Sequence, residues 1–152
     1  MDSKVEPGDV IGVSRILYEH YGVYIGEGKV IHYHMKNSEI KLTVQETDIE
    51  EFLGGASTFF ILDCEYRQPH KSAPIKYREA EEIFSKVKVF SPEDTIKRAK
   101  NKIGEGEYNL FLNNCEHFAI WCKTGIRQSH QIEELLWFIP RIKQSAKTAL
   151  CL

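Results

Sequence analysis

The chain has 152 residues, of which 42% are hydrophobic and 28% are charged, a composition that excludes collagen-like, low-complexity and largely disordered proteins. Its 20 lysines and arginines stand against 22 aspartates and glutamates. The net charge of −2 offers neither a basic excess for nucleic acid nor an acidic tail, so we expect no nucleic-acid partner. At this length we expect one globular domain over residues 1–152.

The cysteines and the chain ends bear on the compartment. The four cysteines lack the repeated spacing of zinc knuckles or secreted disulfide frameworks; they are Cys64, Cys115, Cys122 and Cys151. The first seven residues do not resemble a secretory signal, and no segment approaches the roughly 20 apolar residues of a membrane-spanning helix. These features favour a soluble protein in the reducing cytoplasm. Residues 146–152 turn apolar as the chain stops, which suggests that a native membrane anchor is missing.

The first sixty residues have the pattern of short β-strands. Two runs rich in β-branched and aromatic residues are joined by Gly26-Glu27-Gly28, which is a hairpin signal. The next strand alternates charged and apolar residues, and the last is a short apolar run suited to a buried position. We expect strands over residues 9–15, 21–25, 29–33, 39–44 and 58–62.

The second half of the chain is predicted to be mainly helical. Ser91 can cap a helix that has Pro92 at its first position and stops at Gly104. A second helix begins at Asn113 or Asn114 and runs through Lys123. We expect a third helix over 131–147, interrupted at Pro140, whereas residues 75–89 combine helical spacing with an extended-looking end and are assigned to neither. Strands followed by helices indicate an α+β fold, an antiparallel sheet packed against helices, with its core over about 7–125 and a C-terminal helical segment over 130–149.

Cys115, His20 and His32 are the candidates for a nucleophilic site. Cys115 lies in the first turn of a predicted helix, where free backbone amides and the helix dipole favour a thiolate. Pairing about a turn near Glu27 places residues whose numbers sum to roughly 53 opposite each other, so the two histidines are near neighbours with a one-residue offset. His20 then acts as general base and His32 orients it.

Each of these residues also has an ordinary structural interpretation. A cysteine on an apolar helix is more often a small core residue than a nucleophile, and hairpin histidines are more often structural or exposed. Judged on residue types alone, the structural interpretation is the more frequent one.

Two segments carry a family resemblance that changes this balance. The stretch His-Tyr-Gly-Val-Tyr-Ile at 20–25, continued to His32, and the block Asn-Cys-Glu-His-Phe at 114–118 resemble the lecithin:retinol acyltransferase domain. That family includes the phospholipase A/acyltransferase (H-Ras-like suppressor) proteins and belongs to the NlpC-type, circularly permuted papain-like superfamily. The resemblance extends from about Pro7 to Gly125, with histidine before cysteine in the permuted order. It implies an NlpC/LRAT-like fold.

The resemblance also implies roles for individual residues. Cys115 matches the nucleophile that forms an acyl thioester, His20 the general base and acid, and His32 the second histidine, with no cofactor and no metal. The backbone amide of Cys115 and an unidentified donor near Tyr21 are expected to hold the oxyanion. His117 lies about 200° round the helix from Cys115 and is expected to be structural.

The implied reaction is acyl transfer from a glycerophospholipid through the Cys115 thioester. The acceptor is water, the amine of phosphatidylethanolamine, lysophospholipid or retinol; His20-Tyr21-Gly22 looks closer to the retinol branch and the compact length to the phospholipase branch. The family implies a cytoplasmic protein held peripherally at intracellular membranes, commonly through an apolar C-terminal anchor. Residues 135–139 form an apolar cluster that suits either a core helix or a membrane interface.

Two other functions fit the same residues. Because the superfamily also contains peptidases and amidases, Cys115 is a candidate for cleaving a peptide or isopeptide bond. A catalytically inactive binding module is the second alternative, since a fold does not establish function. A zinc site that uses Cys115 and His117 is disfavoured, because this spacing points the two ligands to different sides of a helix.

Overall fold

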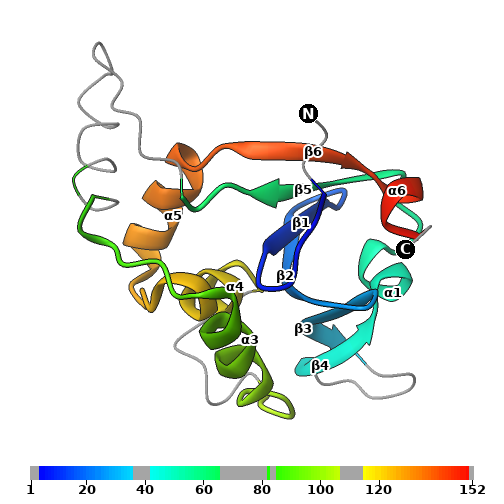
Figure 1. Cartoon of the computed structure of the whole chain (residues 1–152), viewed down its shortest axis with the longest axis horizontal. Coiled ribbons are helices and arrows are strands. Elements are labelled where there is room, and N and C mark those ends of the chain that lie inside the picture. Colours follow the sequence, from blue (N-terminus) through cyan, green and yellow to red (C-terminus); the bar gives the residue numbers. More distant parts are fainter. Residues whose placement is uncertain (1–3, 36–41, 66–81, 83–84, 107–114, 151–152) are drawn as a thin grey trace.

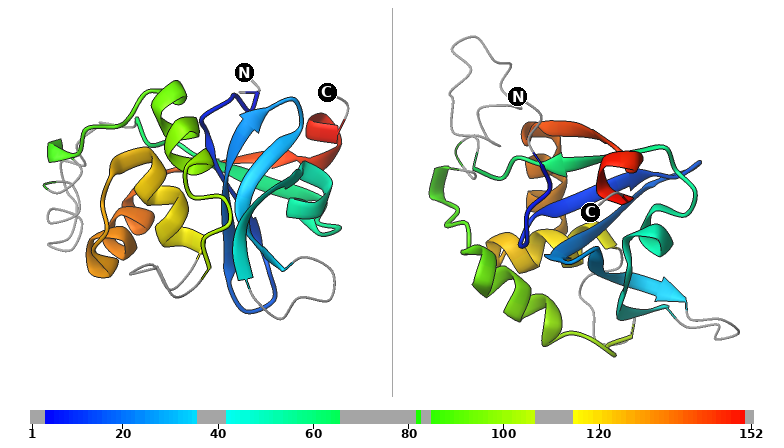
Figure 2. Two further views of the ribbon diagram at one scale, coloured as in Figure 1. Left: turned by 90° about the horizontal axis from the view of Figure 1, so that it is seen from below. Right: turned by 45° about the vertical axis from the view of Figure 1, so that its right-hand side comes forward.

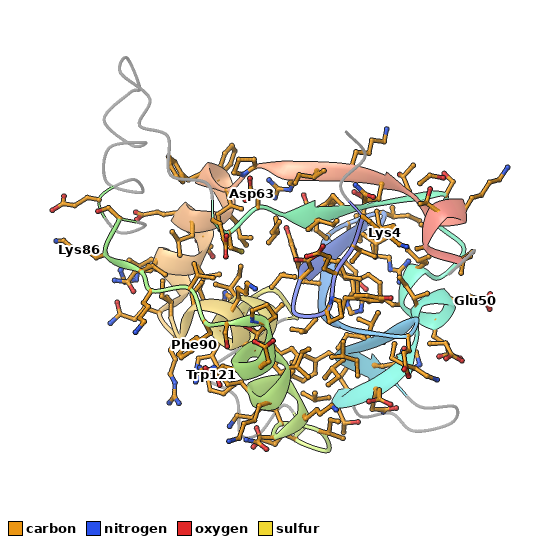
Figure 3. The ribbon with its side chains drawn as sticks, in the orientation of Figure 1. Lys4, Glu50, Asp63, Lys86, Phe90 and Trp121 are labelled. Carbon is orange, nitrogen blue, oxygen red and sulfur yellow. The ribbon has the colours of Figure 1, made fainter. Side chains whose placement is uncertain are left out.

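The computed structural model describes residues 4–35, 42–65, 82, 85–106 and 115–150, without the side chains of Cys115, Glu116 and Ser129. A β-sheet forms its centre, and helices cover both faces of the sheet (Figures 1 and 2). Side chains fill the space between these layers (Figure 3). The predicted α+β architecture, an antiparallel sheet packed against helices, is confirmed.

The six described strands form one sheet in which every neighbouring pair is antiparallel. They are β1 (Val10–Ser14), β2 (Glu19–Gly26), β3 (Lys29–Met35), β4 (Leu42–Asp48), β5 (Thr58–Leu62) and β6 (Arg141–Ser145). Their order across the sheet is β4-β3-β2-β1-β5-β6, which places the predicted hairpin of β2 and β3 in the interior. Of the strand predicted over 39–44, residues 39–41 lie outside the described residues; from Leu42 the strand continues to Asp48, and β4 pairs with β3 along its whole length.

The helices form two layers on opposite faces of the sheet, as Figure 2 shows. One layer contains α3 (Pro92–Lys100), α4 (Cys115–Thr124) and α5 (Ser129–Phe138), and the other contains α1 (Ile49–Leu53) and α6 (Ala146–Leu150). Alternation along β2 sends Tyr21 into the core beneath α4, with Phe118, and Tyr24 into the core beneath α1, with Phe52. Each of these buried aromatic side chains contributes on the order of 2 kcal/mol through the area it removes from water.

Helix α3 begins as the sequence predicts and holds α4 in place. Ser91 Oγ accepts a hydrogen bond from the amide of Asp94 at 3.1 Å, and a proline occupies the first helical position. The Arg98 guanidinium lies 4.0 Å from the centre of the Trp121 ring and donates a hydrogen bond to the Trp121 carbonyl at 3.0 Å. Phe90 lies close to the same guanidinium, 4.3 Å away, and Figure 3 labels both aromatic residues.

The C-terminal segment differs from the helix predicted over 131–147 and from the helical segment expected over 130–149. Helix α5 ends at Phe138, because Pro140 cannot continue it, and β6 follows. Strand β6 pairs with β5 along its full length and so covers an edge of the sheet that would otherwise be open. Among the described residues, no helix is long and apolar enough to cross a bilayer.

Candidate active site

His20 and His32 form a hydrogen-bonded pair in the middle of the sheet. His20 Nε2 lies 2.9 Å from His32 Nδ1, and the two rings meet edge to face with their centroids 5.1 Å apart. The residues are 9% and 1% exposed, so water has little access to the bond between them. Two of the three predicted catalytic residues are therefore brought together.

The register of the hairpin places both histidines on one face of the sheet. His32 lies opposite Gly22, so His20 is two positions away, and the predicted one-residue offset is wrong. The turn pairs Gly26 with Lys29, and a β-bulge between Tyr24 and Gly26 then shifts the pairing by one residue, so that Gly22 and not Val23 lies opposite His32. Because side chains alternate with a period of two, the even offset allows the two imidazoles to meet.

An aromatic side chain from α1 packs against both imidazoles. Phe52 stacks on His20 with the ring centroids 5.1 Å apart and meets His32 edge to face at 5.2 Å. Arg15, in the turn after β1, donates hydrogen bonds to the carbonyls of Phe52 and Leu53 at 2.7 and 2.8 Å. These bonds fasten α1 to the sheet and hold the aromatic ring over the pair.

Thr47 on β4 extends the pair into a chain of hydrogen bonds. Its Oγ1 lies 2.7 Å from His32 Nε2 and donates its own proton to the Asp48 carbonyl at 3.0 Å. The oxygen is then the acceptor for His32 Nε2–H, which leaves His32 Nδ1 to accept from His20 Nε2–H. This network assigns an unprotonated Nδ1 to His20, and that nitrogen can take up a proton.

The electrostatic surroundings keep both histidines neutral near pH 7. Burial, followed by the neighbouring Arg15 and His34, lowers the pKa of His20 from 6.5 to about 4. Burial, followed by the neighbouring His20 and His34, lowers the pKa of His32 to about 3. His34 itself faces Glu51 on α1, with 2.8 Å between Nε2 and the carboxylate. A neutral His20 suits the role of proton acceptor from a thiol.

Cys115 is the first residue of α4, and its side chain lies outside the described part of the chain. Near the end of α4, Lys123 Nζ donates to the Gly8 carbonyl at 3.0 Å, and the Gly8 amide donates to Tyr24 at 2.7 Å. Earlier in the helix, Phe118 meets Tyr33 edge to face at 5.6 Å. Helix α4 therefore runs parallel to β2, and its N-terminus lies toward the end of β2 that carries His20.

The histidine pair and α4 are associated with different faces of the sheet. The rings of His20 and His32 pack against α1, whereas the apolar side of α4 packs on the opposite face. The described side chains do not include Cys115, so the contact between its thiol and His20 remains a prediction. The oxyanion donors are likewise a prediction.

Two other residues of α4 are buried. His117 is 4% exposed and burial lowers its pKa. Cys122 is fully buried, and burial raises the pKa of its thiol to about 12, so it is a poor nucleophile at neutral pH. Cys122 therefore belongs to the core.

An open cleft of about 740 Å³, the α5 cleft, lies at the end of the sheet where β2 begins. Its walls come from the β1-β2 turn, β2, α5 and the start of β6. The lining residues are Ser14, Arg15, Tyr18, Glu19, Tyr21, Glu133, Leu136, Trp137 and Arg141. Within the described ranges, no three His, Cys, Asp or Glu residues are grouped to hold a metal ion.

Sequence reasoning missed Thr47, Phe52 and the α5 cleft. The first two come from β4 and α1, and their contacts with the histidines depend on pairing and packing between segments distant in sequence. The alternating pattern of β4 predicts a strand, but it does not identify which residue faces an imidazole.

Comparisons with known proteins identify the family of the chain. The family model for lecithin retinol acyltransferase matches residues 3–128. The chain is 27% identical over 150 residues to lecithin retinol acyltransferase of Mus musculus, which covers 94% of this chain and 64% of that protein. It is 28% identical to phospholipase A and acyltransferase 3 of Mus musculus and to phospholipase A and acyltransferase 4 of Homo sapiens, with 85% of this chain and 76% of each relative covered.

The chain thus spans less than two thirds of the length of the retinol acyltransferase that it matches. The family model nevertheless covers most of this chain, including both histidines and the start of α4. The chain belongs to the lecithin retinol acyltransferase family.

Proposed function

We propose that this protein is a cysteine-dependent acyltransferase and phospholipase A that takes an acyl chain from a glycerophospholipid. The observation that carries the proposal is the buried, neutral His20-His32 pair, oriented by Thr47. A general base whose free nitrogen is defined by its partners is what thiol activation requires. The names of the relatives, lecithin retinol acyltransferase and phospholipase A and acyltransferase, support the same chemistry.

The proposed first half-reaction forms a thioester. The Cys115 thiol gives its proton to His20 Nδ1, and the thiolate, favoured by the N-terminal end of α4, attacks the ester carbonyl of the phospholipid. When the tetrahedral intermediate collapses, the carbon–oxygen bond to the glycerol breaks. His20 returns its proton to that oxygen, lysophospholipid leaves, and the acyl chain remains on Cys115.

In the second half-reaction His20 takes a proton from the acceptor as the acceptor attacks the thioester. The carbon–sulfur bond then breaks, and His20 returns the proton to the Cys115 thiolate. Water gives a free fatty acid, the amine of phosphatidylethanolamine gives an N-acyl product, and lysophospholipid or retinol gives an ester. The protein is proposed to act at the surface of intracellular membranes, where these lipids are found.

Intact-protein mass spectrometry after incubation with phosphatidylcholine tests the proposal. Wild type should gain the mass of one acyl group, and Cys115→Ala should gain none. Cys64→Ala is a matched control, since it also removes one thiol, and it should acylate like wild type. An acyl mass that persists in Cys115→Ala would contradict the proposed nucleophile. No acyl mass on wild type, together with cleavage of a peptide substrate, would select the peptidase alternative instead.

Product analysis then separates the acceptors. Wild type loaded with labelled acyl groups would be offered water alone, phosphatidylethanolamine, lysophosphatidylcholine or retinol, and the labelled products would be separated by liquid chromatography. Retinyl ester as the main product would place the activity with the retinol acyltransferases, and free fatty acid with the phospholipases.

A further inference from the structure

The turn between β1 and β2 presents consecutive large apolar side chains to solvent. Ile16 is 100% exposed and Leu17 92%, and Tyr18 follows at 60%. Single exposed aliphatic residues are common on protein surfaces, but adjacent ones mark interaction sites when they lie beside further apolar surface. This turn lies two residues before His20.

The turn has a defined shape. The Arg15 amide donates to the Tyr18 carbonyl at 2.7 Å, which closes the loop, and the Arg15 guanidinium is bound to two carbonyls of α1. Ile16 and Leu17 are therefore held outward on a turn that is fastened at its base. Little conformational freedom remains to be lost when the turn enters an apolar phase.

Trp137 on α5 adds to the same surface. It is 80% exposed, whereas Leu135, Leu136, Phe138 and Ile139 are buried, so the apolar cluster predicted at 135–139 is divided between core and surface. Both Trp137 and Tyr18 line the α5 cleft, so the helix and the turn both contribute to its wall. We call Ile16, Leu17, Tyr18 and Trp137 the rim patch.

The charges that line the cleft are balanced. The lining contains two arginines, Arg15 and Arg141, and two glutamates, Glu19 and Glu133. Arg141 is paired with Glu19 at 3.2 Å and donates to the Tyr21 hydroxyl at 3.2 Å. A neutral set of opposite charges, with aromatic side chains in the same lining, is complementary to a headgroup that carries both a phosphate and an ammonium.

We propose that the rim patch inserts into the surface of a phospholipid bilayer, with the α5 cleft facing zwitterionic headgroups. The inference rests on the proposed function, because the enzyme must take its substrate from a bilayer. The aliphatic side chains reach the acyl region, and the tyrosine and tryptophan lie at the interface, where aromatic rings with a polar group are favoured. A bilayer fits this surface better than a protein partner, because the apolar residues project from a turn and a helix as separate points around a polar cleft.

Vesicle flotation tests the proposal. Wild type should bind vesicles of pure phosphatidylcholine, and high salt should leave binding unchanged, because insertion does not depend on net charge. The double variant Ile16→Ser/Leu17→Ser should bind at least tenfold more weakly, as expected for withdrawing two aliphatic side chains from an apolar phase. The matched control is Ile103→Ser, which changes a 45% exposed isoleucine in the turn after α3 and should bind like wild type.

Two further readouts complete the test. The melting temperature of each variant shows that it is folded, and the tryptophan emission of wild type should shift to the blue as Trp137 leaves water. The proposal would be refuted if the double variant bound vesicles as tightly as wild type, or if Ile103→Ser lost as much vesicle binding as the double variant. It would also be refuted if high salt abolished the binding of wild type.

The same experiments distinguish failure of the membrane-insertion proposal from failure of the enzymatic proposal. If wild type does not bind vesicles but acquires an acyl group from monomeric short-chain phosphatidylcholine, the patch is wrong and the enzymatic proposal stands. If wild type binds through the patch but acquires no acyl group from either substrate, the patch stands and the enzymatic proposal fails.

Discussion

Replacing Thr47 by valine removes the hydroxyl that orients His32 and preserves the shape of the side chain. In the structure this hydroxyl accepts from His32 Nε2–H at 2.7 Å and donates to the Asp48 carbonyl. Without an acceptor for Nε2–H, the tautomer of His32 that carries its proton on Nδ1 becomes more stable, because that N–H can donate to His20 Nε2. His20 must then carry its own proton on Nδ1, the nitrogen proposed to receive the proton of Cys115.

The size of the effect follows from the cost of a polar group that loses its partner. Leaving one partly buried donor unpaired costs about 1–3 kcal/mol. If this free energy shifts the equilibrium between the two imidazole tautomers, the tautomer of His20 with an unprotonated Nδ1 becomes about 10- to 100-fold less populated. We therefore expect kcat to fall by about 10- to 100-fold in Thr47→Val. The KM for monomeric phosphatidylcholine should change little, because Thr47 does not line the cleft.

Steady-state kinetics and ¹⁵N NMR of the imidazoles measure the two consequences separately. In wild type, His20 should show an unprotonated Nδ1 and a protonated Nε2, and Thr47→Val should reverse or mix this pattern. Thr47→Ser restores the hydroxyl and should recover most of the rate. Wild-type kcat and an unchanged tautomer in Thr47→Val would refute the reasoning. A Thr47→Ser variant as slow as Thr47→Val would show that the methyl group matters and the hydroxyl does not.

Three further predictions concern stability and reactivity. Because the pKa of His20 is lowered from 6.5 to about 4, the stability that its neutral form contributes is fully present above pH 6.5 and is lost as the pH falls toward 4. In urea unfolding, wild type should therefore lose about 2–3 kcal/mol more stability between pH 7 and pH 4.5 than His20→Asn loses. Gly22→Ala should cost about 1–3 kcal/mol in thermal unfolding, since its Cβ would lie 2.7 Å from Val30, whereas Gly106→Ala, whose nearest contact is 3.8 Å away, should cost almost nothing. Iodoacetamide at pH 8 should leave Cys122 unmodified in the native protein, as measured by mass spectrometry of the peptide that contains it. Rapid labelling would contradict the burial that raises the pKa of this thiol to about 12.

The parts of this fold that local sequence predicts are those with local causes. The Ser91 cap with Pro92 predicts the start of α3, and the short apolar run at 58–62 predicts β5, because both depend on neighbouring residues. The C-terminal strand was predicted as a helix, since the pairing of β6 with β5 joins residues about eighty positions apart. Local periodicity carries no information on such a partner.

The candidate site divides in the same way. His20 and His32 are found from the hairpin and the family resemblance, because the two strands are adjacent in sequence. Thr47 and Phe52 reach the pair only after β4 and α1 have packed, and Arg15 acts through α1 carbonyls that no motif names. The positions of the two histidines are thus easier to predict than the residues that orient them.

Because of the bulge between Tyr24 and Gly26, the number of residues in the turn decides whether the side chains of His20 and His32 lie on the same face of the sheet. Adding or deleting one residue in this turn would leave a hairpin that still pairs, but it would rotate one imidazole to the opposite side of the sheet. A change of two residues would restore the common side, though at a different spacing. We therefore expect the histidine pair to tolerate substitution in this turn far more readily than a change in the number of its residues.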